Sequence, residues 1–376
     1  MSKILFISNI AKRVGSFSVA SIEAAHRNGL DFYMAANWAS ATDEQLREDE
    51  QEFNVKIINI DLARAPYSRK NIAAYKQLVD FIRKENVDYI HCNTPVGGLL
   101  GRLAGKKCKV KKVIYQAHGF HFWKGAPLKN WLIYYPIERW LAHYTDALIT
   151  INKEDYERAQ GFRLRNNGKV YYVPGVGTDI SKFDVHDVNR EAKREELGLA
   201  PTDVALVSVG EYTEDKNLLF TIKAMSKLPE NYKYFLCGEG HLREEYEKCI
   251  REHHLEKRVK LLGYRTDIPE LLKSLDLYVF PSTSEGLSRA LMEAMAAQIP
   301  VVCSKIRGNT DLIKDENCIF DCHNEDEYIN SVSYGISKGE EVCKENFENL
   351  KAFSLPTVID IITKIYQVEF FKEKTK

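Results

Sequence analysis

The sequence has no hydrophobic run long enough to cross a membrane. None of its 376 residues belongs to a stretch of 18 consecutive apolar residues, which is about the minimum for a transmembrane helix. The first residues, MSKILFISN, have a strand pattern without a long apolar core or a small-residue cleavage site. We therefore expect a cytoplasmic protein, with its eight cysteines as reduced thiols.

The chain also has no excess charge of either sign, with 53 basic and 53 acidic residues. This balance gives no overall attraction to nucleic acid. It conceals an asymmetry, because residues 1–180 carry 26 basic and 18 acidic side chains, against 27 and 35 in residues 181–376. The first half is therefore expected to meet an anionic partner or surface.

Metal-binding patterns are lacking as well. Cys318, Cys322 and His323 lie close in sequence, but their spacing does not supply four zinc ligands and no second pair follows. No Asp-x-Asp motif occurs anywhere in the chain. We expect no metal.

Short apolar runs alternate with longer amphipathic segments along the whole chain. Strands are expected at 3–8, 31–36, 55–60, 88–93, 112–118, 146–152 and 170–175, and, after the Pro/Gly-rich linker 174–183, at 204–210, 232–238, 259–264, 276–282, 299–304 and 318–321. Helices between strands, for example at 70–85 and 130–143, favour parallel sheets covered on both faces. The prediction is two Rossmann-like, doubly wound α/β domains, 1–175 and 176–355, with a cleft between their strand C-terminal edges. Helix 356–373 is expected to pack back on the first domain.

One segment, STSEGLSRALMEAMAAQIPVVCS (282–304), combines a strand-to-helix loop with two carboxylates. A helix starting near Ser288 would leave the amides of Gly286, Leu287 and Ser288 free to bind an anion. Glu285, before the helix, could accept hydrogen bonds from sugar hydroxyls, and Glu293 could accept them from a ribose. A solvated Glu293 is an equally good interpretation of this segment alone.

The pattern Glu285-x7-Glu293, continued by AMAAQIPVVCSKIRGNTDLI, resembles the retaining nucleotide-sugar glycosyltransferases of family 4, which have the GT-B fold. The resemblance extends over nearly the whole chain through VGSFSVASIEAAHRNG, QAHGFHF, VPGVGTDISKF, VGEYTEDKN and LLGYRTDIPELL. QAHGFHFWKGAPLKNWLIYYPIERWL and IRGN are especially similar to bacterial capsule and exopolysaccharide enzymes. The resemblance implies transfer of a hexose or N-acetylhexosamine from a UDP-sugar to a polyprenyl-diphosphate-linked saccharide. The place of action would be the inner face of the plasma membrane.

The resemblance also assigns roles in the second domain. Glu285 would hold the donor sugar, the amides of Gly286, Leu287 and Ser288 the diphosphate, and Glu293 the ribose. Lys216 would neutralise the leaving diphosphate, although a surface lysine is the alternative. The family's additional arginine is replaced by Glu211 and Tyr212, so Arg289 or Arg265 would have to compensate.

Three further positions are carried over from the family. Tyr264 and Arg265 would line the base pocket, and an ion pair with Asp267 is the alternative for Arg265. Gly15 would let the backbone of the first loop approach donor or acceptor, unless it is a plain turn glycine. His118, at a strand end, would touch the donor sugar, with His121 as the weaker candidate. The resemblance implies a transfer mechanism that is independent of metal and needs no cofactor.

The first domain contains a basic and aromatic segment at 106–140. Nucleic acid binding is disfavoured by the overall charge balance, whereas the family resemblance favours an anionic membrane surface and a lipid-linked acceptor. A buried aromatic helix face is the alternative for some of these residues. The same chemistry on a soluble or protein acceptor, or a non-catalytic subunit that binds nucleotide sugar, also remains possible. The residues concerned are Lys106, Lys107, Lys109, Lys111, Lys112, Phe120, Phe122, Trp123, Lys124, Lys129, Trp131, Tyr134 and Tyr135.

Overall fold

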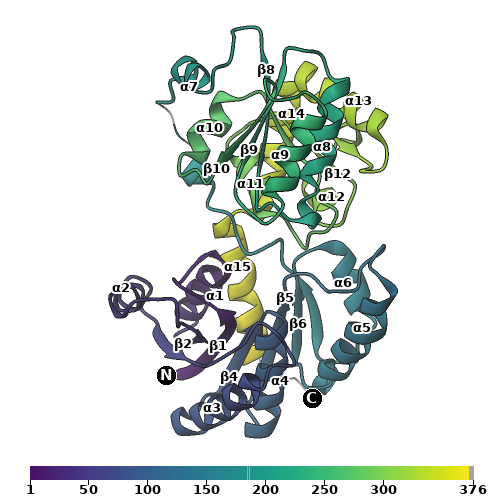
Figure 1. The fold of residues 1–376 in the computed structure, drawn as a ribbon. Helices are drawn as coiled ribbons and strands as arrows, with labels where there is room; N and C mark the ends of the chain where they lie inside the picture. The colour runs from purple at the N-terminus through teal and green to yellow at the C-terminus, as the bar shows by residue number, and fades with distance from the viewer. Residues whose placement is uncertain (184, 186, 372–376) are drawn as a thin grey trace. The chain divides into compact units, whose positions relative to one another are not determined.

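The computed structural model describes residues 1–183, 185 and 187–371. The chain divides into two compact units. The first unit comprises Met1–Gly177 together with the C-terminal segment from Leu355, and the second comprises Thr178–Ser354 (Figure 1). The boundaries inferred from sequence, at 175 and 355, lie within two residues of these divisions.

The first unit is built on a seven-stranded parallel sheet in the order β3-β2-β1-β4-β5-β6-β7. Its strands are β1 (Ser2–Ile10), β2 (Leu30–Asn37), β3 (Lys56–Asn59), β4 (Tyr89–Asn93), β5 (Lys112–Ala117), β6 (Ala147–Thr150) and β7 (Lys169–Tyr172). Its helices are α1 (Ser16–Arg27), α2 (Asp43–Phe53), α3 (Lys70–Glu85), α4 (Pro95–Cys108), α5 (Leu128–Ala142), α6 (Lys153–Ala159) and α15 (Leu355–Tyr366). All seven predicted strands of this half are present.

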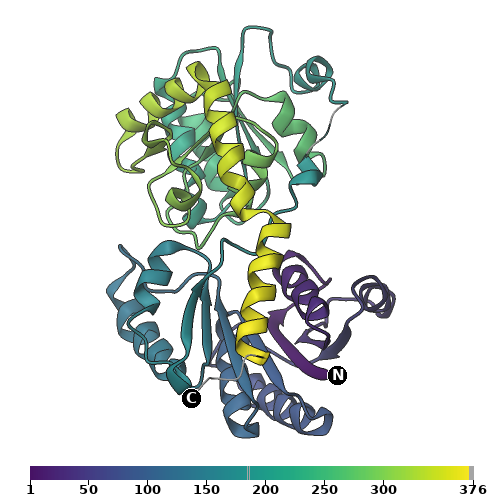
Figure 2. The same cartoon turned by 180° about the vertical axis from the view of Figure 1, so that it is seen from behind.

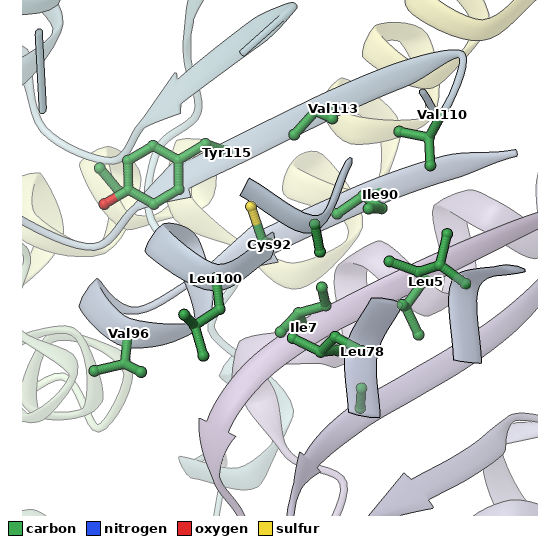
Figure 3. Packing of buried hydrophobic residues seen from close by; sticks show 14 of the residues in the cluster. Leu5, Ile7, Leu78, Ile90, Cys92, Val96, Leu100, Val110, Val113 and Tyr115 are labelled. Carbon is green, nitrogen blue, oxygen red and sulfur yellow. The ribbon is translucent and has the colours of Figure 1, made fainter. Parts of the chain in front are cut away.

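The central strands form a core because their side chains are apolar on both faces. On one face, Leu5 and Ile7 of β1 and Ile90 of β4 meet Leu78 of α3 and Leu100 of α4 (Figure 3). These five side chains are at most 6% exposed. The packed core fixes the positions of the strand ends, from which the functional loops leave.

The second unit has a six-stranded parallel sheet in the order β10-β9-β8-β11-β12-β13. Its strands are β8 (Val204–Val209), β9 (Tyr232–Cys237), β10 (Val259–Gly263), β11 (Leu277–Phe280), β12 (Val301–Ser304) and β13 (Ile319–Phe320). The surrounding helices are α7 (Arg190–Glu196), α8 (Leu218–Ala224), α9 (Arg243–Glu252), α10 (Ile268–Ser274), α11 (Arg289–Ala296), α12 (Asn309–Leu312), α13 (Glu325–Ser337) and α14 (Gly339–Leu350). The fold class predicted from the sequence, two doubly wound parallel-sheet domains, is confirmed.

The C-terminal helix packs on the first unit, as the sequence predicted. Figure 2 shows α15 alongside α1, where Val358, Ile362 and Tyr366 complete the second core face of the sheet. The Tyr366 hydroxyl lies 2.6 Å from Nδ1 of the buried His91. A π-helical turn follows at Gln367–Phe371, and residues 372–373 of the predicted helix lie outside the described residues.

In each sheet the strand order reverses once, between β1 and β4 in the first unit and between β8 and β11 in the second. Doubly wound sheets bind ligands at this reversal, outside the carboxyl ends of the strands, because the loops there diverge and leave a crevice. Lys216 follows β8 and Glu285 follows β11, so the topology brings both to this place. Within the described residues, no helix is both long and apolar enough to span a bilayer.

Candidate functional site

Lys216 and Glu285 meet at the strand-order reversal of the second unit. Lys216 Nζ lies 2.5 Å from Oε1 of Glu285, with 24% and 14% of the respective side chains exposed. The lysine stem packs over Gly210, which contributes no side chain of its own. A cation and a carboxylate that are both half-buried at such a loop junction can hold a charged, hydroxyl-bearing ligand.

Backbone contacts fasten the two loops to each other. The amide of Thr283 donates to the carbonyl of Asp215 at 2.7 Å, and the Ser282 hydroxyl donates to the same carbonyl at 2.8 Å. The Ser282 hydroxyl is also 3.2 Å from Oε1 of Glu285. The pairing of Lys216 and Glu285 is therefore built into the loop backbone and does not depend on two long side chains alone.

The helix after Glu285 begins as the sequence predicts. Ser288 is the N-cap of α11, and its hydroxyl accepts from the Leu291 amide at 3.2 Å. In the described part of the chain, the amides of Gly286, Leu287 and Ser288 donate to no backbone carbonyl. These three donors, with the positive end of the helix dipole, suit a phosphate group.

Glu293 lies in the second turn of α11 and is partly buried, with 25% of its side chain exposed. Burial raises the pKa of its carboxyl, and the nearby Arg289 opposes that effect. Arg289 Nη2 lies 3.1 Å from Oε1 of Glu293. The fully solvated interpretation of Glu293 is therefore wrong, and Arg289 is occupied by a carboxylate.

Tyr264 and Arg265 line a cavity of about 500 Å³ together with Gly210, Glu211 and Gly238. Tyr264 is 79% exposed, so its ring is open to contact by a planar ligand. Arg265 is held by Asp267, at 2.7 and 2.5 Å, and by Glu196 at 2.8 Å. The ion pair considered as the alternative for Arg265 is thus present, and it lowers the pKa of Asp267 through hydrogen bonding to the guanidinium.

Sequence reasoning missed a supporting loop, 305–309, that follows β12. Arg307 donates from Nε to the backbone carbonyl of Glu285 at 3.0 Å. Gly308 has φ +80, and a Cβ there would lie 2.6 Å from the carbonyl oxygen of Gly286. The only signal was IRGN, noticed as a similarity to capsule enzymes. This loop therefore holds the backbone of Glu285, whereas Lys216 pairs with its side chain.

His118 follows β5 at the carboxyl edge of the first unit's sheet. Neither ring nitrogen has a hydrogen-bond partner among the described residues, and both are sealed from solvent. Desolvation lowers the pKa of His118 to about 4, so the ring is neutral at pH 7. Its edge contacts Phe17 of α1, with ring centroids 5.2 Å apart. A neutral imidazole with two unused nitrogens can donate to or accept from a hydroxyl.

Gly15 is the N-cap of α1, with an extended backbone (φ −141). A Cβ built there would meet no atom closer than the Arg13 carbonyl oxygen at 4.0 Å. Neither a positive φ nor internal crowding therefore requires glycine at this position, and its role in approaching a ligand stays a prediction. The open space over Gly15 leaves room for a ligand near the Phe17–His118 contact.

Two neighbouring strands end in further unsatisfied polar groups, which the sequence analysis did not single out. Both side-chain polar atoms of Asn93, at the end of β4, and Oε1 of Gln116, in β5, are buried without a partner among the described residues. Thr94 follows with φ +62, an uncommon conformation for a residue with a Cβ. Buried polar groups are normally paired, so this edge is suited to a hydrogen-bonding ligand. The sequence feature that could have predicted this site is the run of polar residues HCNTP at the end of an apolar strand.

A cavity of about 330 Å³ lies beside these strand ends. His118, Thr94 and Tyr115 line it together with Tyr134 and Ile137 of α5. His121 also lines it, and its ring packs against Tyr134 with centroids 4.7 Å apart. The first unit thus has an aromatic cavity with polar side chains in its lining, which can take a saccharide or an apolar chain.

The basic and aromatic segment is divided between interior and surface. Phe120 and Phe122 are 2% and 0% exposed and stack in the core, so they are buried, but in the loop between β5 and α5 and not on the helix face considered as the alternative. Lys111 pairs with Asp88 at 2.7 Å, and Lys112 with the buried Glu369 at 3.1 Å. Lys106, Lys107 and Lys109 are exposed.

Two Rossmann-like units in tandem are the architecture expected for the GT-B fold, and a lysine, a carboxylate and a helix N-terminus meet at the strand-order reversal of the second unit. The sequence matches the family "Glycosyl transferases group 1" over residues 189–349 and the family "Glycosyl transferase 4-like" over residues 3–152. The chain therefore belongs to the glycosyltransferases that these two family descriptions cover.

Individual relatives agree with this assignment. The chain is 35% identical to the "Putative glycosyltransferase EpsD" of Bacillus subtilis, covering 83% of this chain and 81% of that one. It is 29% identical to an Escherichia coli "UDP-Gal:alpha-D-GlcNAc-diphosphoundecaprenol alpha-1,3-galactosyltransferase", covering 79% of each. Its fold is similar to that of Anabaena Alr3699/HepE in complex with UDP and glucose, with a TM-score of 0.77, 19% identity, and 98% and 100% of the two chains covered.

Proposed function

We propose that this protein transfers a sugar from a UDP-sugar to a polyprenyl-diphosphate-linked saccharide, with retention of anomeric configuration, in capsule, exopolysaccharide or O-antigen-type biosynthesis. The observation that carries the proposal is the pairing of Lys216 with Glu285 beside the free amides at the start of α11. In this arrangement a single UDP-sugar could place its sugar hydroxyls at the carboxylate and its diphosphate at the cation.

Lys216 and the amides of Gly286, Leu287 and Ser288 act on the leaving group. As the bond between the anomeric carbon and the β-phosphate oxygen breaks, negative charge grows on the phosphate, and these donors stabilise it. The acceptor oxygen bonds to the same face of the sugar, and its proton passes to the departing phosphate oxygen. No protein base, cofactor or metal is required in this scheme.

Glu285 holds the donor sugar and Glu293 the ribose. Tyr264 and the Arg265 loop border the cavity proposed for the base, where Arg265 acts as a wall fixed by Asp267 and Glu196. Lys216 is itself paired with Glu285, so pairing with a carboxylate does not distinguish it from Arg265 and Arg289. We assign the diphosphate charge to Lys216 and the helix amides because the loop of Lys216 is hydrogen-bonded to the loop that leads into α11.

The first unit is proposed to bind the acceptor, with His118 in contact with a sugar hydroxyl. The unpartnered polar atoms of Asn93, Gln116 and His118, together with the open space at Gly15, support a hydroxyl-rich ligand there. The lipid-linked character of the acceptor is proposed from the Escherichia coli relative, whose name specifies a diphosphoundecaprenol substrate. The place of action would be the inner face of the plasma membrane.

A thermal-shift panel of UDP-, GDP- and ADP-sugars tests the donor. UDP-sugars at 100 times their dissociation constant should add about 2.7 kcal/mol of stability, and the GDP- and ADP-sugars at the same concentration should add much less. Transfer to a synthetic prenyl-diphosphate sugar, compared with the same sugar lacking the lipid, tests the acceptor. Equal transfer to the lipid-free sugar would favour a soluble acceptor.

A further inference from the structure

The outward face of helix α5 is apolar. Five of its large hydrophobic side chains are 42–73% exposed, and among the exposed side chains of this helix the only others are a proline and two basic residues. In Figure 1, α5 runs along the outside of the first unit's sheet. The exposed residues are Leu128, Lys129, Leu132, Ile133, Pro136, Ile137, Arg139 and Trp140.

These residues form one continuous stripe. At 3.6 residues per turn they fall within one half of the helix circumference, and Leu128 and Trp140 are about 18 Å apart along the axis. Single exposed hydrophobic residues are common on protein surfaces, but contiguous ones mark interaction sites. Helix α3 shows the contrast, because around Ile72 its exposed side chains are mainly charged: Lys70, Lys76, Asp80, Arg83 and Lys84.

The inner face of α5 holds the helix in this orientation. Trp131 and Tyr135 pack against the core of the sheet. Glu138, the acidic residue of the helix, points inward and receives Arg102, which is 1% exposed, through two hydrogen bonds of 2.7 and 3.1 Å. Turning the apolar stripe inward would break this buried ion pair, which is costly. The stripe is therefore presented outward by the fold.

Charge favours one occupant for this face. The stripe carries Lys129 near its beginning and Arg139 near its end, and exposed Lys106 and Lys107 lie on α4, which packs beside α5. Lys106 Nζ lies 4.0 Å from the ring of Tyr144, just after α5. A second copy would bring identical positive charges together, whereas an anionic lipid surface complements them. An apolar stripe with basic residues and tryptophan is also the composition of interfacial helices.

We propose that α5 inserts its apolar stripe into the headgroup and acyl boundary of an anionic bilayer, and that this insertion, more than the lysines 106–112, holds the protein on the membrane. The inference deepens the proposed function, since a membrane-bound position would serve a lipid-linked acceptor. It also changes the expectation from sequence, because Lys111 and Lys112 are already paired with Asp88 and Glu369.

Vesicle co-sedimentation tests the insertion. With vesicles of phosphatidylglycerol and phosphatidylcholine, the native protein should sediment at low salt and still do so at about 0.5 M salt, where exposed charges are screened within a few ångströms. The variant Leu132→Ser/Ile133→Ser should lose at least about tenfold in partitioning at both salt concentrations, from the lost apolar burial. The matched control Ile72→Ser, at a side chain 61% exposed on α3, should bind vesicles as the native protein does.

Tryptophan fluorescence reports whether the apolar stripe of α5 enters the bilayer. Trp140 is 49% exposed. The fluorescence emission of the native protein should therefore shift to the blue on adding vesicles, and this shift should disappear in the variant Trp140→Phe. Equal sedimentation of the double serine variant and the native protein would overturn the proposal. So would a native dimer in solution that the double variant converts to a monomer. UDP-sugar binding, measured separately, distinguishes failure of this inference from failure of the proposed enzyme activity.

Discussion

The Nζ atom of Lys216 lies 2.5 Å from Oε1 of Glu285, although 69 positions separate the two residues in sequence. Each side chain is thereby held in place at the strand-order reversal before any ligand arrives. A site whose charged groups are already oriented loses less entropy on binding than one whose side chains must be ordered by the ligand.

Replacing Glu285 and replacing Glu293 should have different effects on catalysis and on UDP binding. Glu285→Ala should lower kcat by about 100-fold or more, as loss of a transition-state contact does, while UDP still binds. Glu293→Ala should instead weaken UDP by about tenfold, the cost of a lost charge-assisted hydrogen bond. Calorimetric titration of UDP and steady-state kinetics measure both effects. Equal loss of UDP affinity in the two variants would contradict the separate roles.

Transfer should be insensitive to chelation. Because the chain has no Asp-x-Asp motif and the diphosphate is assigned to Lys216 and the amides of α11, activity in excess EDTA should equal that in buffer. The measurement is the initial rate after dialysis against EDTA, with and without added Mg²⁺ or Mn²⁺. Activity that disappears and returns only with the metal would show that the diphosphate is bridged by a cation.

Gly308 should be required for the geometry of the donor loop. Gly308→Ala places a Cβ 2.6 Å from the Gly286 carbonyl oxygen at φ +80, so the segment that carries Glu285 must shift. We expect at least about tenfold lower kcat for a misplaced contact, together with a destabilisation of about 1 kcal/mol or more for the positive φ.

Gly29→Ala provides the matched control. Gly29 has a similar φ of +66, but a Cβ there meets nothing within 4 Å. This variant should therefore show the backbone strain in its melting temperature without any change in kcat. If both variants lost the same activity, the effect of Gly308→Ala would be attributable to stability alone.

The first unit should lose stability as the pH falls below about 6.5. Burial is the main cause that lowers the pKa of His91 to about 3; His118 lowers it further, and Gln116 opposes the shift. The unfolded chain, with a histidine pKa near 6.5, therefore takes up the proton first, and the free energy of unfolding falls by about 2 kcal/mol for this residue between pH 7 and 5.

His91→Gln should remove that part of the pH dependence. All four tryptophans, at positions 38, 123, 131 and 140, lie in the first unit, so their fluorescence during urea unfolding reports on it selectively. The difference between pH 7 and pH 5 should be about 2 kcal/mol smaller in the variant. An unchanged difference would mean that His91 is protonated in the folded protein.

The alternation of apolar and amphipathic segments was sufficient to predict the fold, because strands in a covered parallel sheet must be apolar on both faces. The predicted strands correspond to β1–β13, and Ser288, near which the helix was expected to start, is the N-cap of α11. These are local properties, which the sequence expresses through periodicity and capping residues.

Contacts between distant residues were decided by the tertiary structure. The sequence left Arg265 open between the base pocket and Asp267, and gave no sign that Arg307 would reach the carbonyl of Glu285. The orientation of α5 is the clearest case. Its sequence, LKNWLIYYPIERWLA, is apolar around most of the helix, so periodicity does not identify the inward face. The buried ion pair of Arg102 and Glu138 identifies it, because a carboxylate paired with a buried guanidinium must face the interior. The apolar stripe is therefore turned outward.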